Sequence, residues 1–399
     1  MKAAITTMAL YLFSISQLLS QGDTLFQSIM HDDSLRHYIL YVPDAYDGSE
    51  AWPLVINLHG FAWEAASHMT FSNMNPVADT AHFIVAYPQG LTMVATIPGF
   101  PPPSPGFNLG ADSLFVSPDN VDDVGFIGRL IDTVSANYSI DPSRIFSAGF
   151  SNGGMFSHIL ACEESRIAAI AAVGSTLPTT WPCDTSRAVP VLQINGTEEA
   201  ALDYEMGLPG LLHSVPETIE FWLTRNQCDT TPVITSLPDL YTTDSSTVEY
   251  HQWHSCDAEV AHFKVFGGGH QWPGGINLVP FLGNLNLDID ASSEIWNFFN
   301  RNPLTSTKAN LKPAEINLRA YPNPAAAHLN FEFDLPEAAR VQLTLYNPLG
   351  QPIQILSNEQ LPAGRQRINW QRPASVAAGL YYYRLRIGER FLAQPVVLR

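Results

Sequence analysis

The sequence predicts an α/β unit with a mostly parallel sheet covered by helices on both faces, followed by a small all-β sandwich. Up to residue 301, short apolar runs alternate with amphipathic stretches, an order typical of parallel sheets. From residue 318 on, apolar and polar residues alternate between Gly, Pro and Asn turns, as in antiparallel sandwiches. Residues 1–300 carry 8 Lys and Arg against 32 Asp and Glu, whereas residues 301–399 carry 12 against 6. This change of charge also indicates two separate units.

The chain has 399 residues, enough for one large unit and one small unit. A positive start at Lys2, an apolar run and the exit Ser20-Gln21-Gly22 predict a secretory signal peptide over residues 1–20. Residues 24–301 are then expected to form the large unit, and residues 318–399 the sandwich. Residues 302–317 hold Pro and Lys among small polar residues, which is typical of a linker.

The predicted elements follow from apolar runs and helical spacing. The first strands are joined by a polar turn at residues 31–34, and Pro-rich residues 97–107 are expected to form a loop. Strands are predicted at Phe26–Ile29, His37–Val42, Pro53–Leu58, Phe83–Tyr87, Arg144–Ala148, Ile167–Val173, Val189–Ile194 and Ala261–Val265. Helices are predicted at Val124–Tyr138, Gly153–Cys162, Pro216–Asn226 and Ser292–Phe299. The strands of the tail are predicted at Leu329–Phe333, Val341–Tyr346, Arg367–Trp370 and Leu380–Ile387.

Two carboxylates, Asp122 and Asp123, stand at the start of the helix predicted from residue 124. Carboxylates in a first helical turn are stabilised by the helix dipole. We prefer this capping role to metal binding, and no metal site is expected.

The net charge of −18 argues against nucleic acid or anionic lipid as partners, because both are themselves negatively charged. Export would suit the four cysteines, an even number that falls into two sequence-local pairs. We predict the disulfides Cys162–Cys183 and Cys228–Cys256, although two other pairings remain open. The spacings match no zinc pattern of paired CxxC motifs.

The segment Gly149-Phe150-Ser151-Asn152-Gly153 lies between a predicted strand and a predicted helix. A sharp strand-to-helix turn lifts a serine hydroxyl above the sheet, and flanking glycines allow backbone to pass close by. Ser151 is therefore the candidate nucleophile.

A serine nucleophile needs a base and an acid that orients the base. His270 is the candidate base, since it follows a strand on the glycine-rich loop at residues 267–275. His251, His254 and His262 are rivals without such a loop. After the strand Val189–Ile194, three carboxylates compete for the role of the acid, and spacing does not choose among them: Glu198, Glu199 and Asp203.

Two backbone N–H groups are expected to stabilise the oxyanion. One would come from Asn152 and the other from Phe61, in the loop after the strand Pro53–Leu58. His59 in that loop is expected to orient it by hydrogen bonds. Substrate-pocket candidates are His59, Trp272 and Phe107, with a core role for Trp272 equally open.

Residues 24–301 contain the stretches Leu58-His59-Gly60, Asn120–Phe126, Asp141–Ile145, Gly149–Met155, Asn195-Gly196-Thr197 and Gly268–Gly274. With these stretches the large unit resembles the secreted α/β-hydrolases that include polyhydroxybutyrate depolymerases and feruloyl or acetylxylan esterases. The resemblance implies an α/β-hydrolase fold with Ser151 as nucleophile, His270 as base and no cofactor.

The acid loop departs from this family, whose pattern usually reads His-Gly-Thr-x-Asp-x-x-Val-Pro-Tyr. Here Asn195 stands at the His, Glu199 at the acidic Asp, and Asp203 at the Pro before Tyr204. The resemblance therefore implies Glu199 as the acid, with Asp203 in reserve.

Residues 318–399 contain the stretches Tyr321–Pro324, Leu345–Gln351, Pro362-Ala363-Gly364 and Ala378–Leu385. With these stretches the tail resembles the sorting domain of cargo for the type IX secretion system of Bacteroidetes. The resemblance implies outer-membrane secretion machinery as a partner. The rival hypothesis is a polymer-binding module, which would use exposed aromatic residues among Tyr381, Tyr382, Tyr383 and Trp370.

Together these features predict a secreted serine esterase that works through an acyl-enzyme. The expected substrates are plant cell-wall esters, such as feruloyl or acetyl groups on xylan. A polyhydroxyalkanoate depolymerase is the alternative, because it would use the same residues. A non-catalytic polymer-binding surface protein is the third hypothesis. We expect a monomer at the cell surface of a Gram-negative bacterium or outside the cell.

Overall fold

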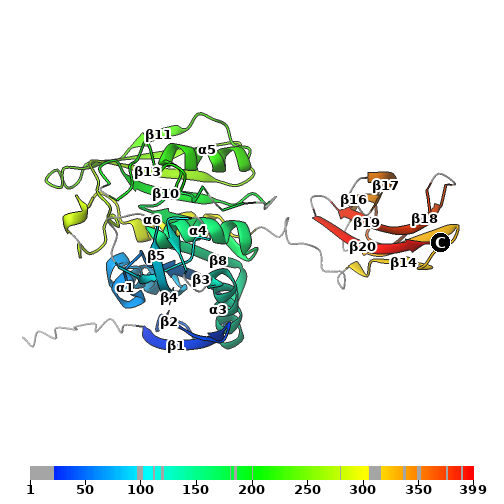
Figure 1. Ribbon diagram of the computed structural model, residues 1–399, viewed down its shortest axis with the longest axis horizontal. Coiled ribbons are helices and arrows are strands. Elements are labelled where there is room, and N and C mark those ends of the chain that lie inside the picture. The colour runs from blue at the N-terminus through cyan, green and yellow to red at the C-terminus, as the bar shows by residue number, and fades with distance from the viewer. Residues whose placement is uncertain are drawn as a thin grey trace, which may run out of the picture. The chain divides into compact units, whose positions relative to one another are not determined.

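The computed structural model describes residues 22–399 except 97–101, 111–112, 118–120, 180, 184–186, 200, 279, 305–315, 336–337, 348–351, 374–375 and 388–389. The signal peptide predicted at residues 1–20 lies outside the described residues. The chain divides into two compact units between Pro303 and Leu304 (Figure 1). Within the described part of the chain, no helix has both the length and the apolarity needed to cross a membrane.

The first unit is built on a ten-stranded sheet with the order β1-β2-β4-β3-β8-β9-β10-β13-β12-β11. Strands β4, β3, β8, β9, β10 and β13 are parallel, and antiparallel strands flank them on both sides. The strands are β1 (Asp23–His31), β2 (Ser34–Val42), β3 (Trp52–Leu58), β4 (Ile84–Pro88), β8 (Ile140–Phe150), β9 (Ile167–Val173), β10 (Val191–Gly196), β11 (Val233–Ser236), β12 (Thr247–Gln252) and β13 (Val260–Phe266). The predicted, mostly parallel sheet is confirmed.

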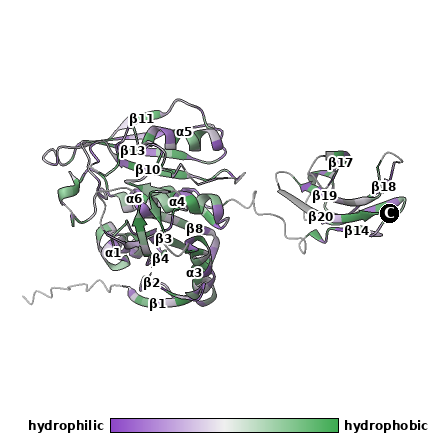
Figure 2. Ribbon diagram, in the orientation of Figure 1, coloured by the Kyte–Doolittle hydropathy of each residue, from purple (hydrophilic) through white to green (hydrophobic). Residues whose placement is uncertain are grey.

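Helices cover both faces of this sheet. One face is covered by α1 (Ala65–Ser72), α2 (Asn75–Ala81) and α6 (Ala291–Arg301), and the other by α3 (Asp123–Asn137), α4 (Asn152–Glu163) and α5 (Val215–Arg225). On the first face, Phe146 of β8 stacks on Phe299 of α6 with centroids 4.6 Å apart. On the second, Ile56 of β3 shares a core with Phe156 and Trp222. Hydrophobic residues gather in the central strands and in α4 (Figure 2). The chain therefore builds two apolar layers around one sheet.

Several elements differ from the predictions. Residues 104–106 form strand β6 (Ser104–Gly106), which pairs with β5 (Leu91–Ala95), so the predicted loop at 97–107 is only partly a loop. The other edge pairing of β5 is with β7 (Phe115–Val116). These strands, like α1, α2, β11 and β12, were not predicted. Each of these elements is short, so its sequence shows no clear helical or strand periodicity. The strands among them are defined by the neighbouring strands with which they pair, and the helices by how they pack on the sheet.

The two predicted disulfides are confirmed. Cys162, in the last turn of α4, bonds to Cys183 with 5.3 Å between the Cα atoms. Cys228, just after α5, bonds to Cys256 with 4.1 Å between the Cα atoms.

The start of α3 corrects one prediction. Asp122 is the N-cap, and its side chain accepts a hydrogen bond from the Gly125 N–H at 2.8 Å, as expected. Asp123 does not cap the helix: its side chain is buried in an ion pair with Arg36 of β2. Two neighbouring carboxylates thus have different surroundings.

The second unit packs a three-stranded sheet, β14-β15-β18, against a four-stranded sheet, β17-β16-β19-β20. Phe331 and Tyr383, one from each sheet, meet edge to face with centroids 4.9 Å apart. Tyr383 and Trp370 are buried in this core, which removes them from any exposed aromatic surface. The strands of the second unit are β14 (Arg319–Tyr321), β15 (His328–Leu335), β16 (Ala339–Tyr346), β17 (Pro352–Leu361), β18 (Gly364–Gln371), β19 (Gly379–Ile387) and β20 (Arg390–Leu398).

Candidate active site

Ser151 lies at the turn between β8 and α4, with φ 52° and ψ −119°. This backbone region is strained for a non-glycine residue, and it presents the side chain at the carboxyl end of the sheet. A Cβ on Gly149 would lie 2.3 Å from the carbonyl carbon of Gly153, so the turn requires glycine there. The Ser151 N–H donates to the Val173 carbonyl of β9 at 2.9 Å, which holds the turn against the next strand.

His270 and Glu199 form a buried pair. Nδ1 of His270 lies 3.0 Å from Oε2 of Glu199, and the two side chains are only 5% and 3% exposed. The other carboxylate oxygen accepts from the Gly196 N–H at 3.2 Å. A carboxylate at Nδ1 leaves Nε2 of the ring as the nitrogen available for proton transfer.

The strand ends bring this pair to Ser151. The His270 ring packs on Phe150, the residue before Ser151, with centroids 4.7 Å apart. Gly174 follows β9 at φ +55°, and a Cβ there would lie 3.1 Å from both rings. A side chain at position 174 would therefore push the imidazole away from the turn.

The loop that carries His270 is glycine-rich because backbone packs directly against it. The His270 N–H donates to the Leu282 carbonyl at 2.7 Å, and the Gly269 N–H donates to the Asn284 carbonyl at 2.9 Å. A Cβ on Gly269 would lie 2.4 Å from the Leu282 oxygen. The loop can follow this path only without a side chain at 269.

The other candidate histidines have other partners. Nε2 of His251 lies 3.0 Å from the Glu249 carboxylate on the same strand. Burial inside β13 holds the pKa of His262 well below its ordinary value, so this ring stays neutral. His254 is exposed beyond the end of β12.

His59 and Gly60 directly follow β3 and lie beside the Ser151 turn. A Cβ on Gly60 would lie 3.4 Å from the Cβ of Ser151, so this loop passes directly beside the serine. His59 is fully buried, with Nδ1 2.8 Å from the Gly60 carbonyl and Nε2 accepting from the Gly90 N–H at 2.9 Å. Burial lowers its pKa to about 4. A neutral His59 therefore shapes the loop, as its position in the sequence predicted.

Known proteins resemble both units. Residues 319–399 match the family model described as a secretion system C-terminal sorting domain. The chain is 26% identical over 252 residues to feruloyl esterase B of Piromyces equi. This match covers 59% of this chain and 42% of that protein. The bifunctional acetylxylan esterase/xylanase XynS20E of Neocallimastix patriciarum is 26% identical over 222 residues, or 55% of this chain and 28% of that protein.

The chain is related in sequence to feruloyl and acetylxylan esterases. It spans less than half the length of either of these two relatives. Among solved structures, an acetyl xylan esterase from Aspergillus awamori is 13% identical, with a TM-score of 0.44 over 62% of this chain and 94% of that one.

Spacing in the acid loop left three carboxylates open, Glu198, Glu199 and Asp203, and of these Glu198 is exposed. Glu199 contacts His270, whereas Asp203 is exposed and accepts from the N–H groups of Glu205 and Met206 at 2.9 and 2.8 Å. Asp203 thus closes its own turn and does not reach the histidine.

Phe61, Phe107 and Trp272 are packed in the interior, and Phe107 and Trp272 have no exposed surface. Phe61 stacks on Phe115 with centroids 4.4 Å apart. Trp272 donates from its indole N–H to the Ser292 hydroxyl at 3.1 Å and so ties the His270 loop to α6. These residues, like His59, support the loops around Ser151 and do not line an open pocket.

The sequence predicts a role only for the backbone N–H of Asn152, but the structure shows that its side chain also binds a distant loop. The Asn152 side chain accepts from the Phe107 N–H at 2.7 Å and donates to the Phe107 carbonyl at 3.0 Å. The two residues are 45 positions apart, so no local pattern signals the contact.

Proposed function

We propose that the protein is a serine carboxylic-ester hydrolase with Ser151, His270 and Glu199 as its catalytic triad. The buried His270–Glu199 contact at 3.0 Å, next to the strained Ser151, is the observation that carries this proposal. A histidine oriented by a carboxylate beside a serine on such a turn is the arrangement that acyl transfer requires.

The mechanism has two matching halves. Nε2 of His270 takes the proton from Ser151 Oγ as that oxygen attacks the ester carbonyl, and Glu199 stabilises the imidazolium. The negative oxygen is bound by the backbone N–H groups of Asn152 and Phe61. His270 then protonates the leaving alcohol. Water attacks the acyl-enzyme in the same way, and the acid is released with Ser151 restored.

The proposed substrates are esters on plant cell-wall polysaccharides, such as feruloyl or acetyl groups on xylan. This choice is supported by the activities that name the related esterases. Polyhydroxyalkanoate hydrolysis would use the same residues, but the names of these two relatives do not support it. The reaction needs no cofactor, and we propose that a monomer carries it out.

The second unit supports a role outside the cell. Its match to a sorting domain indicates export by the type IX machinery to the cell surface or the medium. Such a location suits an enzyme whose polymeric substrate cannot enter the cell.

The experiment is a panel assay of the full chain on p-nitrophenyl acetate, methyl ferulate, acetylated xylan and polyhydroxybutyrate. Hydrolysis of methyl ferulate or acetylated xylan is expected, with no activity from Ser151→Ala. A fluorophosphonate probe should label the native protein and not this variant. Absence of both hydrolysis and labelling in the folded native protein would refute the proposal, while hydrolysis of the polyester alone would replace the substrate.

A further inference from the structure

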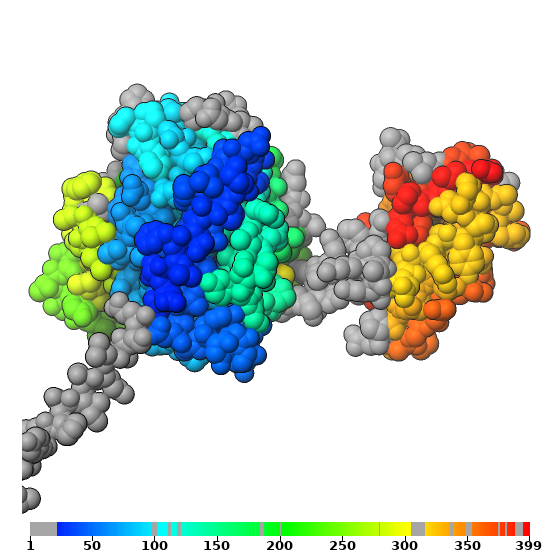
Figure 3. All heavy atoms as spheres, turned by 90° about the horizontal axis from the view of Figure 1, so that it is seen from below, coloured from blue at the N-terminus to red at the C-terminus, as the bar shows by residue number. Residues whose placement is uncertain are grey.

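Asp123 and Arg36 form a buried ion pair that the catalytic mechanism does not use. Nη2 of Arg36 lies 2.5 Å from Oδ1 of Asp123, and each side chain is 1% exposed. The Arg36 guanidinium also lies over the Phe126 ring, 3.9 Å from its centroid. The pair joins β2 to the start of α3, and the β1–β2 hairpin runs beside this helix on the surface (Figure 3).

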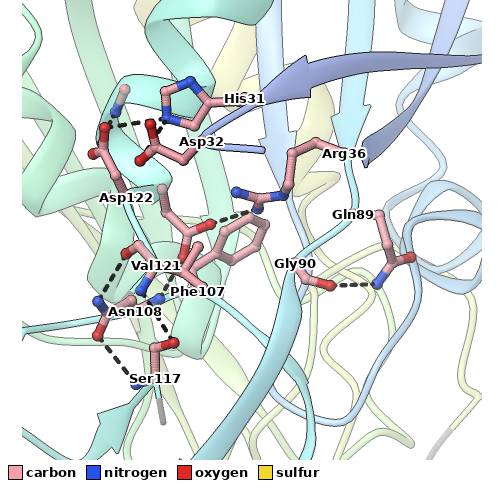
Figure 4. Close-up of polar contacts among 12 residues, drawn as sticks. His31, Asp32, Arg36, Gln89, Gly90, Phe107, Asn108, Ser117, Val121 and Asp122 are labelled. Carbon is pink, nitrogen blue, oxygen red and sulfur yellow. Dashed lines mark hydrogen bonds and ion pairs between the residues drawn. The ribbon is translucent and has the colours of Figure 1, made fainter. Parts of the chain in front are cut away.

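The second oxygen of Asp123 holds a loop. Oδ2 accepts from the backbone N–H of Asn108 at 2.7 Å. The Asn108 side chain in turn donates to the Val121 carbonyl at 2.9 Å, and Figure 4 shows this contact with Arg36 nearby. The carboxylate therefore fixes the peptide between Phe107 and Asn108.

The other side of that loop reaches the residue after Ser151. Both polar atoms of the Phe107 backbone bind the Asn152 side chain, at 2.7 and 3.0 Å, and Asn152 is fully buried. Asn152 begins α4, where backbone N–H groups have no intrahelical acceptor. The two hydrogen bonds of the Asn152 side chain hold this residue, and with it the peptide that carries its N–H, against the Phe107 loop.

We infer that Asp123, paired with Arg36, is a positioning residue for the oxyanion site. It fixes Asn108 and Phe107, which hold the Asn152 side chain, and thereby aim the Asn152 N–H at the oxygen that becomes negative in the transition state. The inference rests on the proposed esterase function and adds Arg36, Asp123 and the Asn152 side chain to it.

A residue that positions the oxyanion donor affects kcat, whereas a residue with a purely structural role affects the stability of the fold. Loss of an oxyanion donor costs about 10²–10³ in kcat, and a misplacement on the order of 1 Å can cost 10²-fold. We expect Asp123→Asn to lower kcat about 10- to 100-fold with KM nearly unchanged. The reason is that the hydrogen bond from the Asn152 N–H to the substrate oxygen acts in the transition state, where that oxygen is negative. Asp122→Asn is the matched control, since it removes the same charge one residue away and asparagine can still cap α3.

Asn152→Ala tests the last contact in this series, between the Asn152 side chain and the Phe107 backbone, and it leaves no buried charge unpaired. It retains the backbone N–H, so a fall in kcat of similar size would come from lost positioning alone. If Asp123 acts through Asn152, the double variant should lose no more than the worse single variant. Thermal unfolding of each variant identifies the folded ones, and Asn152→Ala alone decides if Asp123→Asn does not fold.

The outcomes separate the inference from the proposed function. Full activity in Ser151→Ala would refute the esterase mechanism itself. With Ser151→Ala inactive, the inference is overturned if Asp123→Asn matches Asp122→Asn in kcat, if Asn152→Ala keeps native kcat, or if the losses of the two single variants simply multiply.

Discussion

At the scale of single residues, Glu199 uses both carboxylate oxygens. One contacts His270 and the other accepts from the Gly196 N–H, so the longer glutamate side chain is folded back within its own loop. This double contact gives the glutamate one orientation, which is what an acid in a triad needs.

Replacing Glu199 with Gln should lower kcat by about a thousandfold, since an amide cannot stabilise the imidazolium. Asp203→Asn should change kcat less than about twofold, because asparagine can accept the same turn bonds from Glu205 and Met206. Steady-state hydrolysis of p-nitrophenyl acetate measures both. A larger loss in Asp203→Asn would reverse the assignment of the acid.

A buried histidine in α4 should make the folded protein less stable at acid pH. His158 accepts from the Trp222 indole N–H at 3.1 Å, and burial lowers its pKa to about 3. Between pH 6.5 and about pH 3 the unfolded chain protonates this histidine and the folded chain does not, so the free energy of unfolding falls as pH drops through this range. The slope is about 1.4 kcal/mol per pH unit for one such group.

His158→Gln should make this decline shallower by about 1.4 kcal/mol per pH unit between pH 6 and pH 4, whatever stability it loses at pH 7. Urea unfolding followed by tryptophan fluorescence at several pH values tests this. An identical slope in His158→Gln would mean that this ring is protonated in the folded protein.

At the scale of elements, α5 packs over the strands β10 and β13 that lead to Glu199 and His270. The helix begins with a capping box. Ser214 Oγ accepts from the Glu217 N–H at 3.2 Å, and the Glu217 carboxylate accepts from the Ser214 N–H at 2.8 Å. The two side chains therefore accept hydrogen bonds from two backbone N–H groups at the start of the helix, those of Ser214 and Glu217.

Ser214→Ala should destabilise the protein by about 1 kcal/mol, which lowers Tm by about 2–4 °C. Calorimetry measures the shift, and kcat at 25 °C should stay native because no site residue moves. Thr224→Ala on the exposed side of α5 is the control, with no loss expected. Equal Tm values for both variants would show that the cap contributes nothing.

At the scale of the whole molecule, each unit has its own hydrophobic core. Every proposed catalytic residue lies in the first unit. A chain ending at Pro303 should therefore keep native kcat and KM on methyl ferulate, while a bacterium with the secretion machinery should no longer export it. Assays of the purified protein and of the culture medium test the two statements separately. A fall in kcat on truncation would show that the tail takes part in catalysis.

Much of the first unit could be predicted because its signals are local. A strand, a glycine-flanked serine and a helix follow one another within residues 140–163, and the loop of His270 carries its own glycines. The strands β5, β6 and β7 could not be predicted, since each exists only through its partner.

The sequence by itself predicted the class of fold, the strand-to-helix turn at Ser151, His270 as the candidate base, and the two disulfides with other pairings left open. The class of fold and the turn follow from patterns that neighbouring residues impose on the backbone. Only the tertiary structure shows that Glu199, and not Glu198 or Asp203, contacts His270, and that Asp123 pairs with Arg36 instead of capping α3. His270 lies 71 residues from Glu199, and Arg36 lies 87 residues from Asp123. Such contacts depend on the order of strands in the sheet and the path of the loops, which no local period encodes.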